Sequence, residues 1–207
     1  MQAGRPTTVV FDLGGVLIDW DPRRLYRKIL ADAAEVEWFL AEVCHPAWNL
    51  EQDRGRSFAA AIEEAAGRHP RRRAEIAAYH ARWIEMIGGP IDGTVALLGE
   101  LDREGVPLYA LSNWSAETFP LVRDDPTYAF LGRFRHIVVS GEVGLVKPEP
   151  AIYAHLLKQA GAPAGDCLFI DDNEANIEAA RELGFHVHRF TGPDGLGAAL
   201  RAHRLLP

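Results

Sequence analysis

The stretch Thr7-Thr8-Val9-Val10-Phe11, followed directly by Asp12-Leu13-Gly14-Gly15, decides how the rest of this sequence is interpreted. Its β-branched and aromatic residues predict a short buried strand, and the glycine pair predicts a tight loop after it. Asp12 would then lie at the carboxyl end of the strand. Ligands of open α/β sheets bind beyond that end, so Asp12 is the first candidate functional residue.

The sequence after residue 92 alternates between helical and strand-like segments. The predicted strands are 106–111, 136–139, 167–170 and 185–190, and the predicted helices are 94–104, 115–122, 149–160, 173–183 and 193–203. Strands that are separated by helices indicate βαβ units and a parallel sheet. The predicted fold class is therefore α/β, with a Rossmann-like parallel sheet core that is flanked by helices.

More than ninety residues separate the first two predicted strands, and this segment shows helical periodicity only. The helical patterns cover 22–30, 33–44, 58–66 and 71–87. Gly88-Gly89-Pro90 interrupts the pattern and is predicted to be a hinge. We expect an all-helical inserted cap over residues 21–88, and a core that is formed by residues 1–20 and 89–207.

The composition is that of a globular protein that does not bind polyanions. Of the 207 residues, 48% are hydrophobic and 25% are charged, and the net charge is −7. Nucleic acid and anionic membranes are therefore not expected as partners. The two cysteines, far apart in sequence, predict no disulfide framework, and no signal peptide or spanning apolar run is evident, so a cytoplasmic location is expected.

Polar residues suited to phosphate chemistry follow four of the predicted strands in order. They are Asp12, Ser112-Asn113, Lys147 and Asp171-Asp172. Any one of these groups could simply cap a helix or occupy a loop. Because the carboxyl ends of parallel strands meet at one edge of a sheet, the ordered set of four favours a single site.

These side chains match the needs of phosphate ester cleavage. Carboxylates of Asp12 and Asp172 could hold Mg²⁺, which prefers oxygen ligands, while Lys147 offsets the charge of the phosphoryl group. Further hydrogen bonds could come from the Ser112 hydroxyl and from the backbone N–H groups of Asn113 and the Gly14-Gly15 loop. Asp12 could then attack phosphorus to form an aspartyl-phosphate, which water hydrolyses.

Four stretches resemble the ordered motifs of the haloacid dehalogenase-like (HAD) hydrolase superfamily, namely residues 11–17, 111–113, 144–150 and 169–173. The helical insertion also lies where that family places its small cap. The opening Phe11-Asp12-Leu13-Gly14 is similar to phosphatases of the family, some of which act on sugar phosphates such as glucose 1-phosphate. The resemblance implies a phosphatase that uses Mg²⁺ and a small phosphorylated metabolite as substrate.

The resemblance also implies a role for each matched residue. Asp12 would be the nucleophile, and Ser112 and Lys147 would bind the phosphate. The metal ligands would come from Asp12, the backbone carbonyl of Gly14 and the Asp171-Asp172 pair. We expect Asp172 to be the direct ligand and Asp171 to orient Lys147 or a metal-bound water.

Gly14 departs from the family pattern. Most phosphatases of the family carry an Asp two residues after the nucleophile, where it acts as general acid and then as general base. Such help is worth about 10²–10⁴-fold in rate. The chain could be slow, could use a substrate with a good leaving group, or could place the acid elsewhere, with Asp19, Asp21 and residues 48–54 as candidates.

Two other functions remain open. In a dehalogenase Asp12 would attack carbon and would need no metal, and the Asp171-Asp172 pair argues against that chemistry. In a phosphate-binding module the fold would persist with little turnover, because Gly14 supplies no acid. The retained Asp12, Ser112 and Lys147 argue against this second alternative.

Several polar residues are expected to have structural roles. Asp21 precedes Pro22 and is expected to cap a helix. Glu51 and Asp53 are expected on a solvated helix start. The sequence does not place the aromatic and basic residues that could wall the cleft, namely Trp20, Trp48, Arg54 and Trp114.

Three residues near the last two strands are weighed as possible ligands. Asn176 lies four residues after Asp172 and could either touch a metal-bound water or support the loop. His186 and His188 alternate on a strand, but the sequence offers no third ligand near them. We therefore expect the two histidines to be structural.

Overall fold

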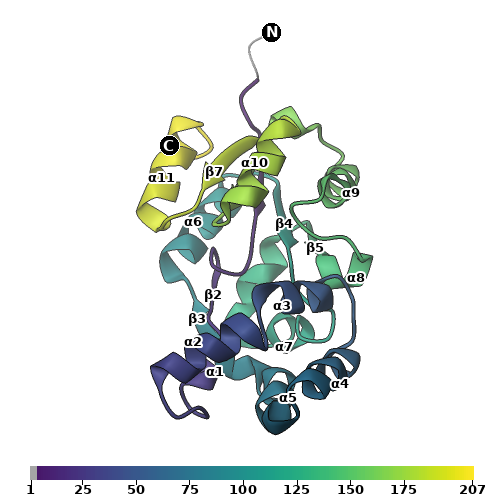
Figure 1. Cartoon of the computed structure of the whole chain (residues 1–207). Coiled ribbons are helices and arrows are strands. Elements are labelled where there is room, and N and C mark those ends of the chain that lie inside the picture. The colour runs from purple at the N-terminus through teal and green to yellow at the C-terminus, as the bar shows by residue number, and fades with distance from the viewer. Residues whose placement is uncertain (1–3) are drawn as a thin grey trace.

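A five-stranded parallel sheet forms the centre of the computed structural model, which describes residues 4–207 (Figure 1). Its strand order is β5-β4-β1-β6-β7. The strands are β1 Thr8–Phe11, β4 Leu108–Ser112, β5 His136–Val139, β6 Cys167–Asp171 and β7 His186–Arg189. All five strands predicted from the sequence are present, and the α/β fold class is confirmed.

Helices cover both faces of this sheet. Val9 and Phe11 point into one apolar cluster with α6 (Asp92–Arg103) and α11 (Pro193–Ala202). Val10 points into a second cluster with α9 (Pro150–Ala160) and α10 (Glu174–Glu182). Figure 1 shows these two helix pairs on opposite sides of the sheet. Burial on both faces explains why the central strands are continuous apolar runs instead of alternating ones.

The central strands bring three strand ends to one edge. β1 pairs in parallel with β4 on one side and with β6 on the other. Phe11 pairs with Ala110 of β4 and with Ile170 of β6, and β4 and β6 end one or two residues later, at Ser112 and Asp171. Asp12, Ser112 and Asp171 are therefore neighbours because of strand register alone.

Five helices lie between β2 (Ile18–Trp20) and β3 (Ile87–Pro90), and Figure 1 shows most of them below the sheet. They are α1 Arg23–Tyr26, α2 Ala33–Glu42, α3 Pro46–Asp53, α4 Phe58–Arg68 and α5 Arg73–Ala81. Short 3₁₀ turns cover Pro70–Arg72 and Trp83–Met86. We call this helical segment the cap; its boundaries at residues 21 and 88 stay a prediction.

The structure corrects four details of the predicted cap. The helix predicted over 22–30 is limited to Arg23–Tyr26, and α3 was not predicted as a separate helix. The helix predicted over 71–87 breaks at Arg82, whose φ of −123° and ψ of 22° lie outside the helical region. The hinge predicted at Gly88-Gly89-Pro90 is part of β3, which pairs antiparallel with β2.

The remaining helices are short and connect the strands of the sheet. They are α7 Pro120–Arg123, α8 Ser140–Val143 and the 3₁₀ turns Pro126–Arg133 and Ala164–Asp166. Within residues 4–207, no helix combines the length and the hydropathy that crossing a bilayer requires.

The turn after β5 packs closely on the loop after β4. The Gly141 N–H donates to the carbonyl oxygen of Trp114 at 3.0 Å. A Cβ atom at position 141 would lie 2.5 Å from the backbone nitrogen of Ala116 and 2.8 Å from the Trp114 oxygen. Both are backbone atoms that cannot rotate away, so only glycine fits here without movement of a loop.

We expect Gly141→Ala to lower the free energy of unfolding by about 1–3 kcal/mol, because the added methyl group overpacks the loop. Gly99→Ala is the matched control, since a Cβ atom there meets nothing within 4 Å and α6 gains about 0.5–1 kcal/mol of helix propensity. Urea denaturation of both variants measures the difference. Equal midpoints for the two variants would contradict the packing argument.

Candidate active site

Asp12 leaves β1 at the start of a tight loop. Its N–H donates to the carbonyl oxygen of Ile170 at 2.8 Å, and its own Oδ1 accepts from the Leu13 N–H at 2.7 Å. Gly15 has a φ of +75°, and a Cβ atom there would lie 2.5 Å from Oδ2 of Asp172. Glycine at position 15 therefore lets the Asp172 carboxylate approach the loop that carries Asp12.

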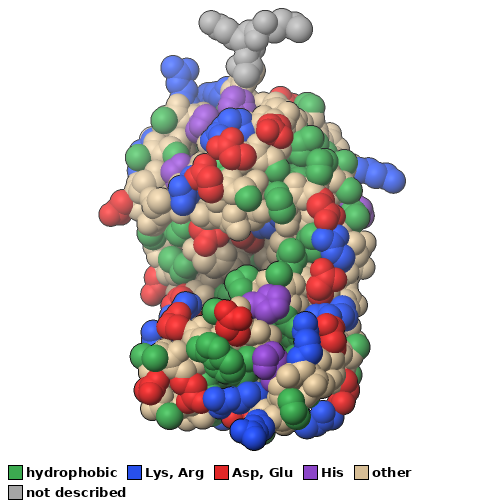
Figure 2. All heavy atoms as spheres, in the orientation of Figure 1, with side chains coloured by type: hydrophobic (Ala, Val, Ile, Leu, Met, Phe, Trp, Pro, Cys, Tyr) green, Lys and Arg blue, Asp and Glu red, His purple; other side chains and the backbone are tan. Residues whose placement is uncertain are grey.

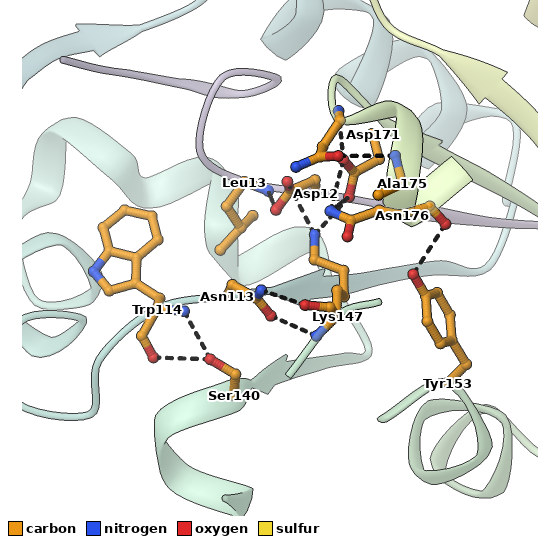
Figure 3. A network of polar contacts seen from close by, with 11 residues as sticks. Asp12, Leu13, Asn113, Trp114, Ser140, Lys147, Tyr153, Asp171, Ala175 and Asn176 are labelled. Carbon is orange, nitrogen blue, oxygen red and sulfur yellow. Dashed lines mark hydrogen bonds and ion pairs between the residues drawn. The ribbon is translucent and has the colours of Figure 1, made fainter. Parts of the chain in front are cut away.

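Lys147 joins two of the predicted site residues (Figure 3). Its ammonium nitrogen lies 2.9 Å from Oδ2 of Asp12 and 2.6 Å from Oδ2 of Asp171, and its side chain is buried. The Asn113 side chain fixes the loop, because it donates to the Lys147 carbonyl oxygen at 2.9 Å and accepts from the Lys147 N–H at 2.8 Å. The Asn113 side chain is thus used for positioning, and phosphate binding by its backbone N–H stays a prediction.

Asp171 and Asp172 have different environments. Asp171 is fully buried, and besides Lys147 its carboxylate accepts from the Asn173 N–H at 2.8 Å and from the Asn176 side chain at 3.1 Å. Asp172 is exposed. Asn176 was expected either to touch a metal-bound water or to support the loop. Its side chain donates to the Asp171 carboxylate, so the contact that the structure shows is the supporting one.

The carboxylates of Asp12, Asp171 and Asp172 form an acidic cluster in which one oxygen of each lies within 4.8 Å of the others. Burial raises the pKa of Asp12 to about 7, although Lys147 opposes that shift. Although Asp172 is exposed as a whole residue, partial desolvation of its carboxylate and the charge of Asp171 raise its pKa. The raised pKa values of Asp12 and Asp172 indicate that Lys147 neutralises only part of the negative charge of the acidic cluster.

A divalent cation fits the acidic cluster. Burial alone would lower the pKa of Lys147, but Asp12 and Asp171 outweigh burial and raise it, so the ammonium stays charged. Within residues 4–207, Lys147 is the one cation that forms an ion pair with the cluster. If all three carboxyl groups are ionised, one ammonium leaves about two negative charges for a divalent cation to neutralise, and carboxylate oxygens are the ligands that Mg²⁺ prefers.

A cavity of about 360 Å³ opens onto the acidic cluster between the sheet and the cap, where Figure 2 shows a hollow. The core supplies Asp12, Gly14, Gly15, Ser112, Asn113, Trp114, Ser115, Thr118 and Asp172. The cap side supplies Trp20, Asn49, Asp53, Phe58 and Trp83. The cavity is therefore charged where it meets the strand ends and largely aromatic toward the cap.

The model of the haloacid dehalogenase-like hydrolase family matches residues 6–184. This chain belongs to that family. The match covers most of the chain, including the ends of β1, β4 and β6 and the loop that carries Lys147. The family resemblance inferred from the motifs is confirmed, and the chain is a HAD-like hydrolase.

Relatives of this HAD-like hydrolase include phosphatases. Sesquiterpene phosphatase astK of Aspergillus oryzae is 28% identical over 181 residues, which cover 84% of this chain and 85% of that protein. A phosphoglycolate phosphatase of Pseudomonas savastanoi pv. phaseolicola is 27% identical over 195 residues, which cover 86% of this chain and 67% of the relative.

Solved structures share the fold of this HAD-like hydrolase. The HAD family enzyme bt-2542 of Bacteroides thetaiotaomicron has a TM-score of 0.73 at 24% identity, over 91% of this chain and 95% of that one. An L-2-haloacid dehalogenase of Xanthobacter autotrophicus has a TM-score of 0.64 at 19% identity, over 98% of this chain and 85% of that one. At these identities the likeness shows the fold alone.

Asp53 is the cavity residue that sequence reasoning misplaced. It was expected on a solvated helix start, but it is the last residue of α3, is 9% exposed and lines the cavity. The prediction was wrong because α3 begins at Pro46 and directs its last turn toward the core. The His45-Pro46 pair was the available signal, since a helix that starts there places Asn49 and Asp53 on one face.

The other candidates for a relocated acid lie elsewhere. Asp19 forms an ion pair with Arg24. Asp21 accepts a hydrogen bond from the Arg23 N–H at 2.9 Å, but the N-cap of α1 is Pro22, so the prediction that Asp21 is the N-cap was wrong by one residue. Neither carboxylate is among the cavity residues of the described chain.

The remaining predicted candidates separate into cavity and non-cavity residues. Trp20 and Trp114 line the cavity, whereas Trp48 is buried in the core of the cap and Arg54 pairs with Glu149. Within residues 4–207, the acidic cluster is the one group of three or more possible ligands with metal-ligand spacing, and His186 and His188 of β7 are not part of it.

We expect Lys147→Met to lower the free energy of unfolding at pH 7 by about 3–5 kcal/mol, because buried carboxylates then face each other without a cation. The loss should shrink as the pH falls toward 4, where protonation of a buried carboxyl replaces the missing charge. Lys158→Met, at an exposed position of α9, is the control and should change stability by less than about 0.5 kcal/mol. Urea denaturation at pH 4 and pH 7 measures both variants, and equal losses would contradict the role of the ammonium.

Proposed function

We propose that this HAD-like hydrolase is a Mg²⁺-dependent phosphatase that hydrolyses small phosphate monoesters through an aspartyl-phosphate on Asp12. The observation that carries the proposal is the buried contact of Lys147 with Asp12, beside two further carboxylates and open to a cavity. The phosphatase relatives support it. So does bt-2542, which at 25% identity and a TM-score of 0.68 is known as a complex with magnesium and inorganic phosphate.

In the proposed reaction, a carboxylate oxygen of Asp12 forms a bond to phosphorus as the bond to the leaving oxygen breaks. Lys147 offsets charge on the phosphoryl oxygens, and the Ser112 hydroxyl donates a hydrogen bond to them. The backbone N–H groups of Gly15 and Asn113 add further donors. Water then attacks phosphorus, which releases phosphate and restores Asp12.

The proposed metal ligands are carboxylate oxygens of Asp12 and Asp172 and the backbone carbonyl of Gly14. When bound, Mg²⁺ supplies positive charge that neutralises the phosphoryl oxygens as the transferred group passes through its transition state. Asp171 is assigned to Lys147, because Lys147 and Asn176 already bind its carboxylate. This assignment makes Asp172 the direct ligand of the pair.

The proposed substrate class is a small sugar phosphate, with glucose 1-phosphate as the first candidate. The cap side of the cavity presents the aromatic rings of Trp20, Phe58 and Trp83 together with the polar side chains of Asn49 and Asp53. A sugar offers apolar faces to such rings and hydroxyl groups to the polar side chains among them.

We expect Asp12→Asn to lower turnover of phosphate monoesters by more than about a thousandfold, because the nucleophile is lost. A panel of phosphorylated metabolites, assayed for phosphate release with Mg²⁺, measures this. Rapid quenching of the wild type should yield an Asp12-phosphorylated peptide. Halide release from a 2-haloacid that persists in EDTA would instead support a dehalogenase, and phosphate binding without turnover would support a binding module.

Mg²⁺ should raise the melting temperature of the wild type, because a ligand that binds the folded state stabilises it by about 2.7 kcal/mol at 100 times its Kd. Asp172→Asn should lose most of this increase. Glu182→Gln removes an exposed carboxylate of α10 outside the acidic cluster and should retain it. A thermal shift measured with and without EDTA tests the site independently of turnover, and an unchanged Mg²⁺ effect in Asp172→Asn would exclude the proposed ligand set.

A further inference from the structure

We infer that Asp53, at the end of cap helix α3, is the general acid and base of the reaction, the role for which Gly14 offers no side chain. The inference rests on the proposed function. It assigns a catalytic residue to a position that lies 41 residues after the nucleophile in sequence but in the same cavity.

The titratable groups that line the cavity lead to this choice. Within the described chain they are Asp12, Asp53 and Asp172. Asp12 and Asp172 belong to the acidic cluster and are assigned to attack and metal binding. Asp53 is the remaining cavity residue that can donate and accept a proton.

Contacts with the core hold the end of α3 in place. The Ser140 hydroxyl donates to the Asp53 carbonyl oxygen at 2.5 Å. The next residue, Arg54, donates to both carboxylate oxygens of Glu149 at 3.0 and 2.7 Å. The Phe58 N–H donates to Glu117 at 2.9 Å. Asp53 is thus positioned by the same core that carries Asp12, and Glu149 lies two residues after Lys147.

The carboxyl group of Asp53 is held by neutral partners. Its Oδ2 accepts from the Asn49 side chain at 3.0 Å, and Asn49 in turn accepts from the Tyr79 hydroxyl at 2.9 Å. Within residues 4–207 it forms no ion pair, and the neighbouring Arg54 is bound to Glu149. A carboxyl group without a close cation can exist in both protonation states.

Burial raises the pKa of Asp53 to about 7, while a hydrogen bond from the Ser115 N–H and the charge of Lys147 act in the opposite direction. Tyr79 faces the same group from α5, and burial raises its pKa well above the usual range, so it stays neutral. A general acid and base works best when its pKa lies near the working pH. Two carboxylates of one cavity with separate tasks follow the pattern known from other acid–base enzymes.

The proton transfers balance over the two steps. As the bond from Asp12 to phosphorus forms and the ester bond breaks, the carboxylic acid of Asp53 gives its proton to the leaving oxygen, which departs as an alcohol. The Asp53 carboxylate then takes a proton from water as the water oxygen bonds to phosphorus and the bond to Asp12 breaks. Asp53 ends protonated, ready for the next cycle.

Asp53→Asn separates this role from that of the nucleophile, because the amide keeps the shape of the side chain and loses only the proton transfer. For an alkyl phosphate, whose leaving group needs a proton, kcat/KM should fall by about 10²–10⁴-fold. For p-nitrophenyl phosphate, whose leaving group needs little help, kcat/KM should change by less than about tenfold. Nitrophenol should appear in a burst that equals the enzyme concentration, followed by slow turnover and an accumulated aspartyl-phosphate.

Glu51→Gln is the matched control, since it removes an exposed carboxylate from the same helix. It should change neither substrate's kinetics. Equal falls for both substrates in Asp53→Asn, without a burst, would overturn the inference. Full turnover in Asp12→Asn would instead overturn the proposed function, whatever Asp53 does.

Two further measurements test the role of Asp53 if Asp53→Asn folds poorly or its kinetics are ambiguous. In the wild type, the fraction of enzyme trapped as aspartyl-phosphate during steady turnover of p-nitrophenyl phosphate should rise below pH 7, because protonated Asp53 cannot activate water; a flat profile from pH 5 to 8 would contradict the role.

The second measurement is the stability of the metal-free protein as a function of pH. Folded Asp53 holds its proton up to about pH 7, whereas the unfolded chain loses it near pH 4. The contribution of Asp53 to wild-type stability should therefore fall over that window, and the melting temperature of Asp53→Asn should rise relative to the wild type from pH 4 to 7.

Discussion

The ammonium of Lys147 is the interaction on which the rest of the site depends. It lies between Asp12 at the end of β1 and Asp171 at the end of β6, and all three side chains are buried. Two carboxylates would repel each other strongly in such a low-dielectric place without a shared cation. Asn113, after β4, holds the backbone of Lys147 through two hydrogen bonds. Residues at the ends of three neighbouring strands, β1, β4 and β6, therefore all contact Lys147. These contacts fix the relative positions of the side chains at the base of the cavity.

The core and the cap divide the chemistry between them. The core supplies charge at the strand ends, whereas the cap supplies aromatic rings and a carboxyl group with neutral partners. A phosphate ester has the same two-part character, since one end is a dianion and the other is an alcohol. The phosphoryl end suits Lys147 and the proposed metal ligands, and the alcohol end suits the cavity wall around Asp53.

The sequence predicted the sheet and the residues at its edge, because both are local properties. A strand buried on two faces has to be a continuous apolar run, so the first polar residue after it lies at the carboxyl-terminal edge of the sheet. Asp53 could not be placed in this way. Its burial depends on which side of α3 meets the core, and that is decided by Ser140, which is 87 residues away, and by the contact of Arg54 with Glu149, which is 95 residues away. Strand β3 was missed because its partner β2 lies on the far side of the whole cap in sequence.

The pairing of β2 with β3 joins the two chain connections between the cap and the core. Both covalent connections between cap and core run side by side as one hydrogen-bonded ribbon, with Ile18 opposite Pro90 and Trp20 opposite Ile87. The two connections therefore leave the core as one paired unit. The contacts of Ser140 and Glu149 with the end of α3 tie the cap to the core at a second place, next to Asp53. The position of Asp53 relative to Asp12 thus depends on tertiary contacts between α3 and the core as well as on the paired connections.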